Sequence, residues 1–449
     1  MKGLFTRKDL ILLVIPIIVE RFLVMAVGMA GTIMISGTGQ AAISAISLAD
    51  NISVLIIYLF SALGSAGNIK VAYYLGARND KGANNMSRQL FAFTMILASI
   101  VTALVVIFNR ELLILLYGDT EKNIVNAAEK FMAITAFSFP FMAFYEVAGA
   151  LFRSMGKTII TLKASVIMNL LNITGNAVLI YGCHMEVEGV AYATAISRII
   201  AAGFVFYNLY RPNNPVYLKG NMSMNMEWPM IKDILKYGLP IMWENIMFQL
   251  GAIIPVMLIA GLGESVIAAN AVANNIVRFQ QLPGMAVNQA VIIVAARCVG
   301  ARDSKQIKHY LKTLIRSIYF MMGIIGLMML LGGRFLVEAC NLSTVGSEMA
   351  LQVVWLHAIV AFLIWSPAYS VPNVLRACGD LKMTALVATV SMWVFRNCLS
   401  FLLIKYTTLG LFSIWIGCYA DWLFRGVWFG ASYLKGNWKK LMLSQNIEM

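Results

Sequence analysis

The sequence aligns with itself when it is shifted by about half its length. Glu20 coincides with Glu244, an offset of 224 residues (244 − 20). The offset decreases by only one residue, to 223, where Arg153-Ser-Met-Gly156 meets Arg376-Ala-Cys-Gly379. Other matches at the offset of 224 are Gly39 with Gly263, Gly76-Ala-Arg78 with Gly300-Ala-Arg302, and Arg110 with Arg334. A register that holds this long indicates two copies of one structural unit.

The composition shows what kind of unit was duplicated. Hydrophobic residues make up 60% of the 449 positions and charged residues 12%, whereas soluble domains average about 25% charged residues. The apolar segments run for about 20 residues between short polar loops, the length that an α-helix needs to cross the hydrocarbon core. We therefore expect an all-α polytopic membrane protein with about twelve transmembrane helices, arranged as two lobes that are parallel six-helix pseudo-repeats.

Hydropathy places six spans in each half of the chain. Those of the first half are residues 10–35, 49–75, 90–108, 127–152, 161–181 and 189–207. Those of the second half are residues 234–260, 273–299, 313–331, 350–375, 384–404 and 411–433. The predicted domains are an N-terminal six-helix lobe over 1–210, a cytoplasmic linker over 211–232, a C-terminal six-helix lobe over 233–433 and a cytoplasmic tail over 434–449.

The basic residues predict the orientation in the cell membrane. If the N-terminus is cytoplasmic, most Lys and Arg residues fall in cytoplasmic loops, and the outer loops hold only Arg110, Lys122, Arg334 and Lys405, with Lys130 close by. Since Lys and Arg accumulate on the cytoplasmic side, both termini are predicted to be cytoplasmic. The same bias accounts for most of the net charge of +14, so no nucleic-acid partner is expected.

Two parallel repeats in a polytopic chain are typical of transporters that work by alternating access. The sequence contains no G-x-x-x-x-G-K-[ST] phosphate loop, so the driving energy is expected to come from an ion gradient. A membrane-embedded enzyme is disfavoured because the sequence lacks a metal-binding acidic cluster such as D-D-x-x-D, and no catalytic or metal-binding residues are expected. A flippase for a lipid-linked saccharide or another amphipathic molecule stays open as an alternative.

Several motifs resemble the multidrug and toxic compound extrusion (MATE) family. They are Leu151-Phe-Arg-Ser-Met-Gly-Lys157, Asn169-Leu-Leu-Asn172-Ile-Thr-Gly-Asn176, Leu375-Arg-Ala-Cys-Gly-Asp380, Gly238-Leu-Pro240 and Gly76-Ala-Arg78. The resemblance covers about residues 10–433. It implies a two-lobed transporter that exports cationic or amphipathic drugs in exchange for H⁺ or Na⁺, without a further cofactor. The expected partners are thus the drug, the ion and the lipid bilayer, and we expect a monomer.

Glu20 and Glu244 are the first candidates for ion coupling. Each lies in the first helix of its half, four residues after a proline (Pro16 and Pro240). Carboxylates inside a membrane are costly and often functional, because they can exchange a proton or attract a cation. The alternative is a structural role, in which they hydrogen-bond across helices or cap the backbone that the prolines leave unpaired. Arg21 and Lys70 could serve as their charge partners.

Glu146 is the second candidate for ion coupling. It could face the interior of the first lobe together with Asn169, Asn172 and Asn176, forming an oxygen-rich site for a proton or Na⁺. Asn side chains in membrane helices also serve simply to join helices. We take Glu20, Glu146, Glu244, Asn172 and Asn176 as the predicted cation-coupling residues.

The sequence departs from the family pattern at two first-lobe acids. The resemblance places an Asp of many members at Gly31 and a second Asp at Asn176. The acid that some members carry in the tenth helix is also missing, since Trp365-Ser-Pro-Ala-Tyr-Ser contains no carboxylate. Either the three glutamates have taken over coupling, or coupling is weak or altered.

Substrate contacts are expected beside the two paired glutamates. Met25 and Met29 follow Glu20, and Met247, Phe248 and Gln249 follow Glu244. Polarisable thioethers adapt to ligands of varied shape, and aromatic faces attract cations.

Charged residues of the last helices are expected to pair with one another. Asp421 and Arg425 lie one helical turn apart, and Arg396 in the preceding span could neutralise a nearby acid.

Overall fold

The computed structural model describes residues 3–35, 40–118, 121–211, 214–217 and 226–445, and the side chains of Met29, Ala30, Thr32, Ile33 and Gln40 lie outside this description. Within these ranges the regular structure is entirely helical, with no strand. Apolar segments take this form in a bilayer because a helix satisfies its own backbone hydrogen bonds. The predicted all-α class is confirmed.

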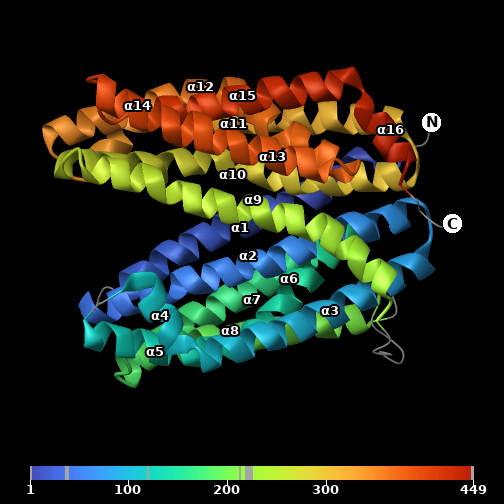
Figure 1. Cartoon of the computed structure of the whole chain (residues 1–449), viewed down its shortest axis with the longest axis horizontal. Helices are drawn as coiled ribbons and strands as arrows, with labels where there is room; N and C mark the ends of the chain where they lie inside the picture. The colour runs from blue at the N-terminus through green and yellow to red at the C-terminus, as the bar shows by residue number, and fades with distance from the viewer. Residues whose placement is uncertain (1–2, 36–39, 119–120, 212–213, 218–225, 446–449) are drawn as a thin grey trace. The chain divides into compact units, whose positions relative to one another are not determined.

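Contacts divide the chain into two compact units. The first unit, Phe5–Met242, contains α1 (Arg7–Ile35), α2 (Gln40–Gly76), α3 (Asp80–Ile107), α4 (Asn109–Tyr117), α5 (Lys122–Ala136), α6 (Phe139–Ser154), α7 (Thr158–Ala177), the π-helix η2 (Val178–Gly182), α8 (Val187–Tyr210) and the start of α9 (Trp228–Ala260) (Figure 1). The second unit, Trp243–Met449 with Met1–Leu4, contains the rest of α9, α10 (Glu264–Gly300), α11 (Ser304–Glu338), α12 (Thr344–Ala377), α13 (Leu381–Ser391), the π-helix η3 (Met392–Cys398), α14 (Leu399–Tyr406), α15 (Phe412–Lys435) and α16 (Asn437–Leu443).

The helices match the expected number of spans closely. Within the described residues, ten helices are long and apolar enough to cross a membrane, and the bent pair α5 and α6 makes an eleventh. Helix α15 has 24 residues, enough to cross, but it carries Asp421 and Arg425 among its apolar residues. The short helices α4 and α16 were not predicted, because neither has the length of a span.

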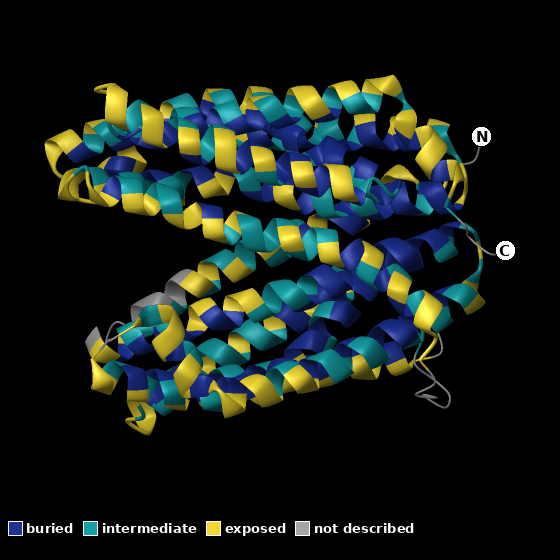
Figure 2. Cartoon of the chain, in the orientation of Figure 1, coloured by how far each residue is buried: buried dark blue, intermediate teal, exposed yellow. Residues whose placement is uncertain are grey.

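The first unit is organised around α2, which packs against α3, α5 and α6, while α7 packs against α1 and α8. Ala42, Ala45 and Ala49 on α2 are buried in its core cluster, and such small residues allow helices to approach closely. Figure 2 shows buried and exposed residues alternating around the helices. Large apolar side chains such as Leu115, 80% exposed, suit a surface that contacts lipid.

In the second unit α10 packs against α11 and α12, and α12 also packs against α15. Gly284 of α10 lies directly against the indole of Trp365 on α12, since a Cβ at Gly284 would come within 2.3 Å of the ring. Trp365 is almost fully buried, with 2% exposed. A close helix contact of this kind requires glycine.

The internal repeat is visible in the backbone of the turns. Arg78 and Arg302 each lie two residues after the end of a helix, α2 and α10, and have positive φ, 58° and 53°. The corresponding turns after α6 and α12 use Gly156 and Gly379, with φ of 79° and 99°. Left-handed residues at helix C-termini let the following amides bond to the last carbonyls. The sequence repeat therefore corresponds to a repeated local structure.

The predicted span over 127–152 is broken into α5 and α6, which meet at an angle of 52°. Pro140 lies in the first turn of α6. A proline lacks an N–H and clashes with the carbonyl four residues earlier, which here belongs to Ala136, the last residue of α5. The break is thus a direct consequence of the sequence.

Candidate ion-coupling and substrate site

Glu20 lies on α1 between two polar partners from other helices of the first unit. The Thr161 hydroxyl of α7 donates a hydrogen bond to Glu20 Oε2 at 3.1 Å. Arg153 at the end of α6 places Nη1 3.9 Å from Glu20 Oε1. Both charged side chains are largely buried, with 15% of Glu20 and 17% of Arg153 exposed. The carboxylate is therefore paired, but not through a short charge-assisted bond.

The backbone that Pro16 leaves unpaired is satisfied without Glu20. Pro16 cannot bond to the carbonyl of Leu12, four residues earlier. The Thr158 hydroxyl of α7 donates to that carbonyl oxygen at 2.8 Å. One of the two structural roles considered for Glu20 is thus performed by another residue.

Glu146 on α6 belongs to the same cluster. It interacts electrostatically with Arg153, Arg21 and Glu20, and its side chain is partly buried. The neighbouring Tyr145 interacts with Glu20, Glu146 and Arg153. Both carboxylates thus lie within electrostatic range of the Arg153 guanidinium and of each other, an arrangement in which the charge of each acid affects the other. We call Glu20, Glu146 and Arg153 the first-unit acid cluster.

The asparagines of α7 make a separate set of contacts. Asn172 Nδ2 donates to the Thr194 hydroxyl of α8 at 3.2 Å, and Asn176 Nδ2 donates to Asn172 Oδ1 at 3.3 Å. Asn169 Nδ2 bonds to the backbone and side chain of Ser165. Asn176 Oδ1 is buried and has no hydrogen-bond partner among the described residues. The contacts recorded for the asparagines are thus with α7 and α8.

Glu244 is held much more tightly than Glu20. Arg376 Nη2 donates to both carboxylate oxygens of Glu244, at 2.7 and 2.6 Å. Arg376 Nη1 also donates to Asn373 Oδ1 at 3.1 Å. The exposed fractions are 21% for Glu244 and 18% for Arg376. The repeat therefore places a Glu–Arg pair at corresponding positions of both units, loose in the first and tight in the second.

The predicted substrate residues are only partly accessible. Met25, Met247 and Gln249 are partly buried, and Phe248 is 38% exposed. The side chain of Met29 lies outside the described residues. Phe248 stacks against Arg396, whose guanidinium carbon lies 5.5 Å from the ring centroid.

Two charged clusters extend what the sequence suggested. Lys70 pairs with Asp233 at 2.8 Å and lies 4.5 Å from the ring of Tyr237. The sequence indicates Lys70 as a charge partner but does not identify Asp233. The sequence signal is a lysine inside an apolar span, which requires a counter-charge because it becomes buried, here to 7% exposed.

In the second unit, Asp421 pairs with both Arg396 and Arg425 at 2.7 Å. Asp421 and Arg425 are buried, with 0% and 4% exposed. Ser391 donates to Asp421 and accepts from Arg425. We call Arg396, Asp421 and Arg425 the second-unit arginine cluster.

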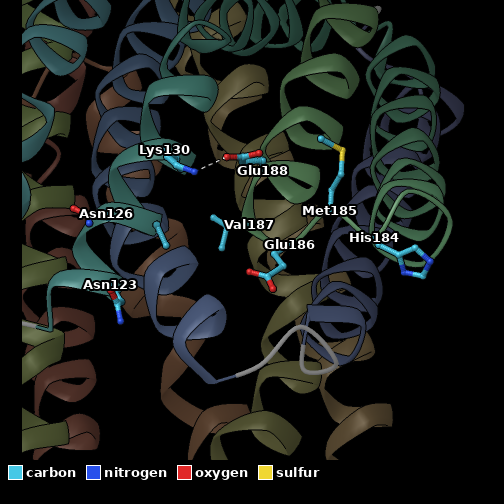
Figure 3. A pocket seen from close by; sticks show the side chains of 9 residues that line it. Asn123, Asn126, Lys130, His184, Met185, Glu186, Val187 and Glu188 are labelled. Atoms are coloured by element: carbon cyan, nitrogen blue, oxygen red, sulfur yellow. Dashed lines mark hydrogen bonds and ion pairs between the residues drawn. The ribbon is translucent and has the colours of Figure 1, made fainter.

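A pocket of about 450 Å³ lies at one end of the first unit (Figure 3). It is lined by Asn123, Asn126, Ala127, Lys130, His184, Met185, Glu186, Val187 and Glu188. Lys130 and Glu188 form an ion pair of 2.9 Å on its wall, with 66% and 44% of their side chains exposed. The pocket is polar and contains none of the predicted site residues.

Comparison with known proteins gives consistent matches over nearly the whole chain. The MatE family model matches residues 16–178 and 240–402. The chain is 28% identical over 420 residues to the uncharacterized transporter YisQ of Bacillus subtilis, covering 92% of this chain and 90% of that protein. It is 24% identical to the probable multidrug resistance protein NorM of Thermotoga maritima, covering 97% and 93% of the two chains.

Solved structures show the same fold. A crystal structure of MATE in the bent conformation matches with a TM-score of 0.88 and 20% identity, covering 98% of this chain and 97% of that chain. An outward-facing multidrug resistance MATE family transporter of the MOP superfamily matches with a TM-score of 0.87 and 20% identity, covering 97% of each chain.

Proposed function

Because the chain belongs to the MatE family of membrane transporters, we propose that it exports cationic or amphipathic small molecules by alternating access, in exchange for H⁺ or Na⁺. The relatives named as multidrug resistance or export proteins support a drug-like substrate. Two internally repeated units support a mechanism in which one moves against the other. The positive-inside bias supports cytoplasmic termini, and we propose that the domains follow the predicted boundaries and that the transporter acts as a monomer.

The first-unit acid cluster is the observation that carries this proposal. Glu20 and Glu146 lie on helices α1 and α6 and share Arg153. Protonation of Glu20, or binding of a cation between the two acids, would weaken the attraction of Glu20 to Arg153 and alter the contact between α1 and α6. Glu146 lies on α6 together with Arg153, so its protonation would act on this contact by changing the charge around Arg153. A change in ion occupancy is thereby coupled to helix packing, as ion-driven transport requires.

The amide oxygens of α7 provide the second part of the proposed site. Asn176 Oδ1 is buried without a partner among the described residues, and Asn172 donates and accepts beside it. Na⁺, like other hard cations, prefers oxygen ligands. We propose that Asn172 and Asn176 assist cation binding in the first unit. We propose that Glu244 contributes to ion coupling in the second unit through its tight pair with Arg376.

Ethidium efflux from cells that express the protein tests this proposal. The proton and sodium gradients are collapsed separately, and efflux is compared for wild type, Glu20→Gln, Glu146→Gln and the surface control Glu338→Gln. We expect loss of one gradient to stop efflux and so to identify the ion. We also expect at least a tenfold loss in both cluster variants and none in the control. Efflux that survives collapse of both gradients, or is unchanged in both cluster variants, would refute ion coupling at this cluster.

Gly31 provides a gain-of-function test of the same idea. A Cβ at Gly31 meets no atom of the described residues within 4 Å, so the first side-chain atom of Gly31→Asp has space, and the substitution would restore the acid that the family resemblance places there. We expect Gly31→Asp to recover part of the efflux that Glu20→Gln loses, at equal expression. No recovery would argue against a coupling role for acids in α1.

A further inference from the structure

We propose that the second-unit arginine cluster is a binding site for the anionic group of an amphipathic substrate, such as the carboxylate or sulfonate of an aromatic compound. The inference rests on the proposed transport function and narrows its substrate class. It is carried by a charge imbalance, by donor groups without partners and by an adjacent aromatic face.

The cluster has one positive charge in excess. Arg396 and Arg425 both pair with Asp421. The other ionisable side chains that interact with Arg396 are Tyr369 and Cys418, which are normally uncharged at neutral pH. Two guanidinium groups thus face one carboxylate. Since an uncompensated charge inside a membrane protein is costly, a retained excess points to a bound counter-charge.

Arg396 also has unused hydrogen-bonding capacity. Its Nε is buried and lacks a hydrogen-bond partner in the part of the chain that the structure describes. The next residue, Asn397, is 3% exposed, and neither of its side-chain polar atoms has a partner within those ranges. A guanidinium offers a planar fork of donors that matches a carboxylate or sulfonate. Arg396 Nε and Asn397 Nδ2 are the donors available for that group.

The backbone around Arg396 is unusual as well. Arg396 and Asn397 lie in η3, a π-helix of seven residues, and such widened turns often occur at functional sites. Helix α15 packs closely on this turn, since a Cβ at Gly417 would lie 2.7 Å from the Arg396 carbonyl oxygen. The position that corresponds to Arg396 in the first half is Ile173. The proposed anion site is therefore specific to the second unit.

An aromatic body can lie next to the charged group. Phe248 covers Arg396 at 5.5 Å and remains 38% exposed, while Arg396 keeps 12% of its side chain exposed. On the other side, Tyr369 lies 5.6 Å from the guanidinium carbon of Arg425. The site thus combines a cation with accessible apolar surface, which suits an amphipathic anion or zwitterion rather than a simple salt ion.

A pair of dyes that differ only in one carboxylate tests the proposal. Rhodamine 110 carries a free carboxylate, and rhodamine 123 is its methyl ester. Fluorescence polarisation would measure their binding to the purified full-length protein in nanodiscs of phosphatidylcholine. We expect rhodamine 110 to bind at least tenfold more tightly than rhodamine 123. Equal affinity, or tighter binding of the ester, would overturn the proposal.

Variants assign the preference to Arg396. Arg396→Gln should abolish the carboxylate preference, and Arg396→Lys, which keeps the charge and the pairing with Asp421, should reduce it by about threefold through loss of the guanidinium fork. Arg334→Gln, a surface change on α11, should leave it intact. If Arg396→Gln does not fold, Arg396→Lys decides: an unchanged preference in that variant refutes the assignment.

Two further comparisons separate a soluble substrate from a lipid headgroup, and the anion site from the transport proposal. Nanodiscs that contain phosphatidylglycerol distinguish a soluble substrate, for which the preference persists, from an anionic lipid headgroup, which would suppress it. Either result supports the anion site. The binding assay does not depend on ion-driven efflux, so a carboxylate preference in binding, without efflux of either ethidium or rhodamine 110, would refute only the transport proposal. Efflux without a carboxylate preference would refute only the anion site.

Discussion

The two repeated glutamates should differ in which property, stability or transport, the same substitution lowers more. Glu20 and Glu244 occupy corresponding positions, and each pairs with the arginine at the end of a later helix in its own unit. Replacement by Gln removes the charge and keeps the shape. We expect Glu244→Gln to lower stability more and Glu20→Gln to lower transport more, because the pair of Glu244 with Arg376 is tight and the pair of Glu20 with Arg153 is loose.

The expected difference follows from the two separations. With an effective dielectric constant of about 20, opposite unit charges attract by about 6 kcal/mol at the 2.6 Å of Glu244 and Arg376 and by about 4 kcal/mol at the 3.9 Å of Glu20 and Arg153. Desolvation offsets part of both attractions. Glu244→Gln should therefore lower the free energy of unfolding by about 2 kcal/mol more than Glu20→Gln.

Thermal unfolding of the purified protein in detergent measures this difference. For a cooperative unit of about 200 residues, 1 kcal/mol corresponds to about 2–4 °C, so the midpoints should differ by about 4–8 °C. Glu338→Gln is the control, because its pair with Arg334 is exposed, at 60% and 75%, and spans one turn of α11. It should shift the midpoint by less than about 2 °C, as expected for a surface ion pair.

Two results would refute this reasoning. Equal midpoints for Glu20→Gln and Glu244→Gln would show that the separations do not govern the strength of the pairs. A larger loss of efflux in Glu244→Gln, at equal amounts of folded protein, would move coupling to the second unit.

Two other substitutions test the packing and the buried lysine. Gly284→Ala should destabilise the second unit by about 2 kcal/mol in thermal unfolding, because its Cβ would overlap the buried ring of Trp365. The control is Gly332→Ala, whose Cβ meets no atom of the described residues within 4 Å and which should be neutral or stabilise by about 0.5 kcal/mol. Equal effects of the two substitutions would contradict a close contact between Gly284 and Trp365. Asp233→Asn should cost about 3 kcal/mol because it leaves Lys70 buried without its counter-charge. Lys70→Met should cost less, because it leaves only Asp233, which is 43% exposed; the reverse order in the same assay would contradict a buried charge at Lys70.

Much of the fold could be predicted from the sequence. Hydropathy locates spans because the bilayer requires long apolar helices, and the repeat predicts that turns such as those at Arg78 and Arg302 share one conformation. The break between α5 and α6 has a local signal in Pro140, but hydropathy merges the two helices into one span. The π-helices have no comparable signal, since they depend on packing between helices such as η3 and α15.

The site was less predictable, because pairing in space cannot be read from spacing along the chain. The sequence indicates Glu20, Glu146 and Glu244 as intramembrane acids. It does not show that Arg153 pairs with Glu20 or that Arg376 pairs with Glu244. The Thr158 bond to the carbonyl beneath Pro16 required the positions of α1 and α7. The pairing of Asp421 with two arginines, Arg396 and Arg425, depends on the packing of η3 against α15, which the sequence does not specify.

The duplicated Glu–Arg pair also has a historical consequence. A half-length ancestor whose first helix carried the glutamate and whose fourth span ended in the arginine would already have contained this bond. Duplication and fusion of such a gene would leave the two copies free to diverge. The ion pair is now short in the second unit, 2.6 Å between Glu244 and Arg376, and longer in the first, 3.9 Å between Glu20 and Arg153. Division of labour between the copies could therefore begin from one inherited bond, without the invention of a new one.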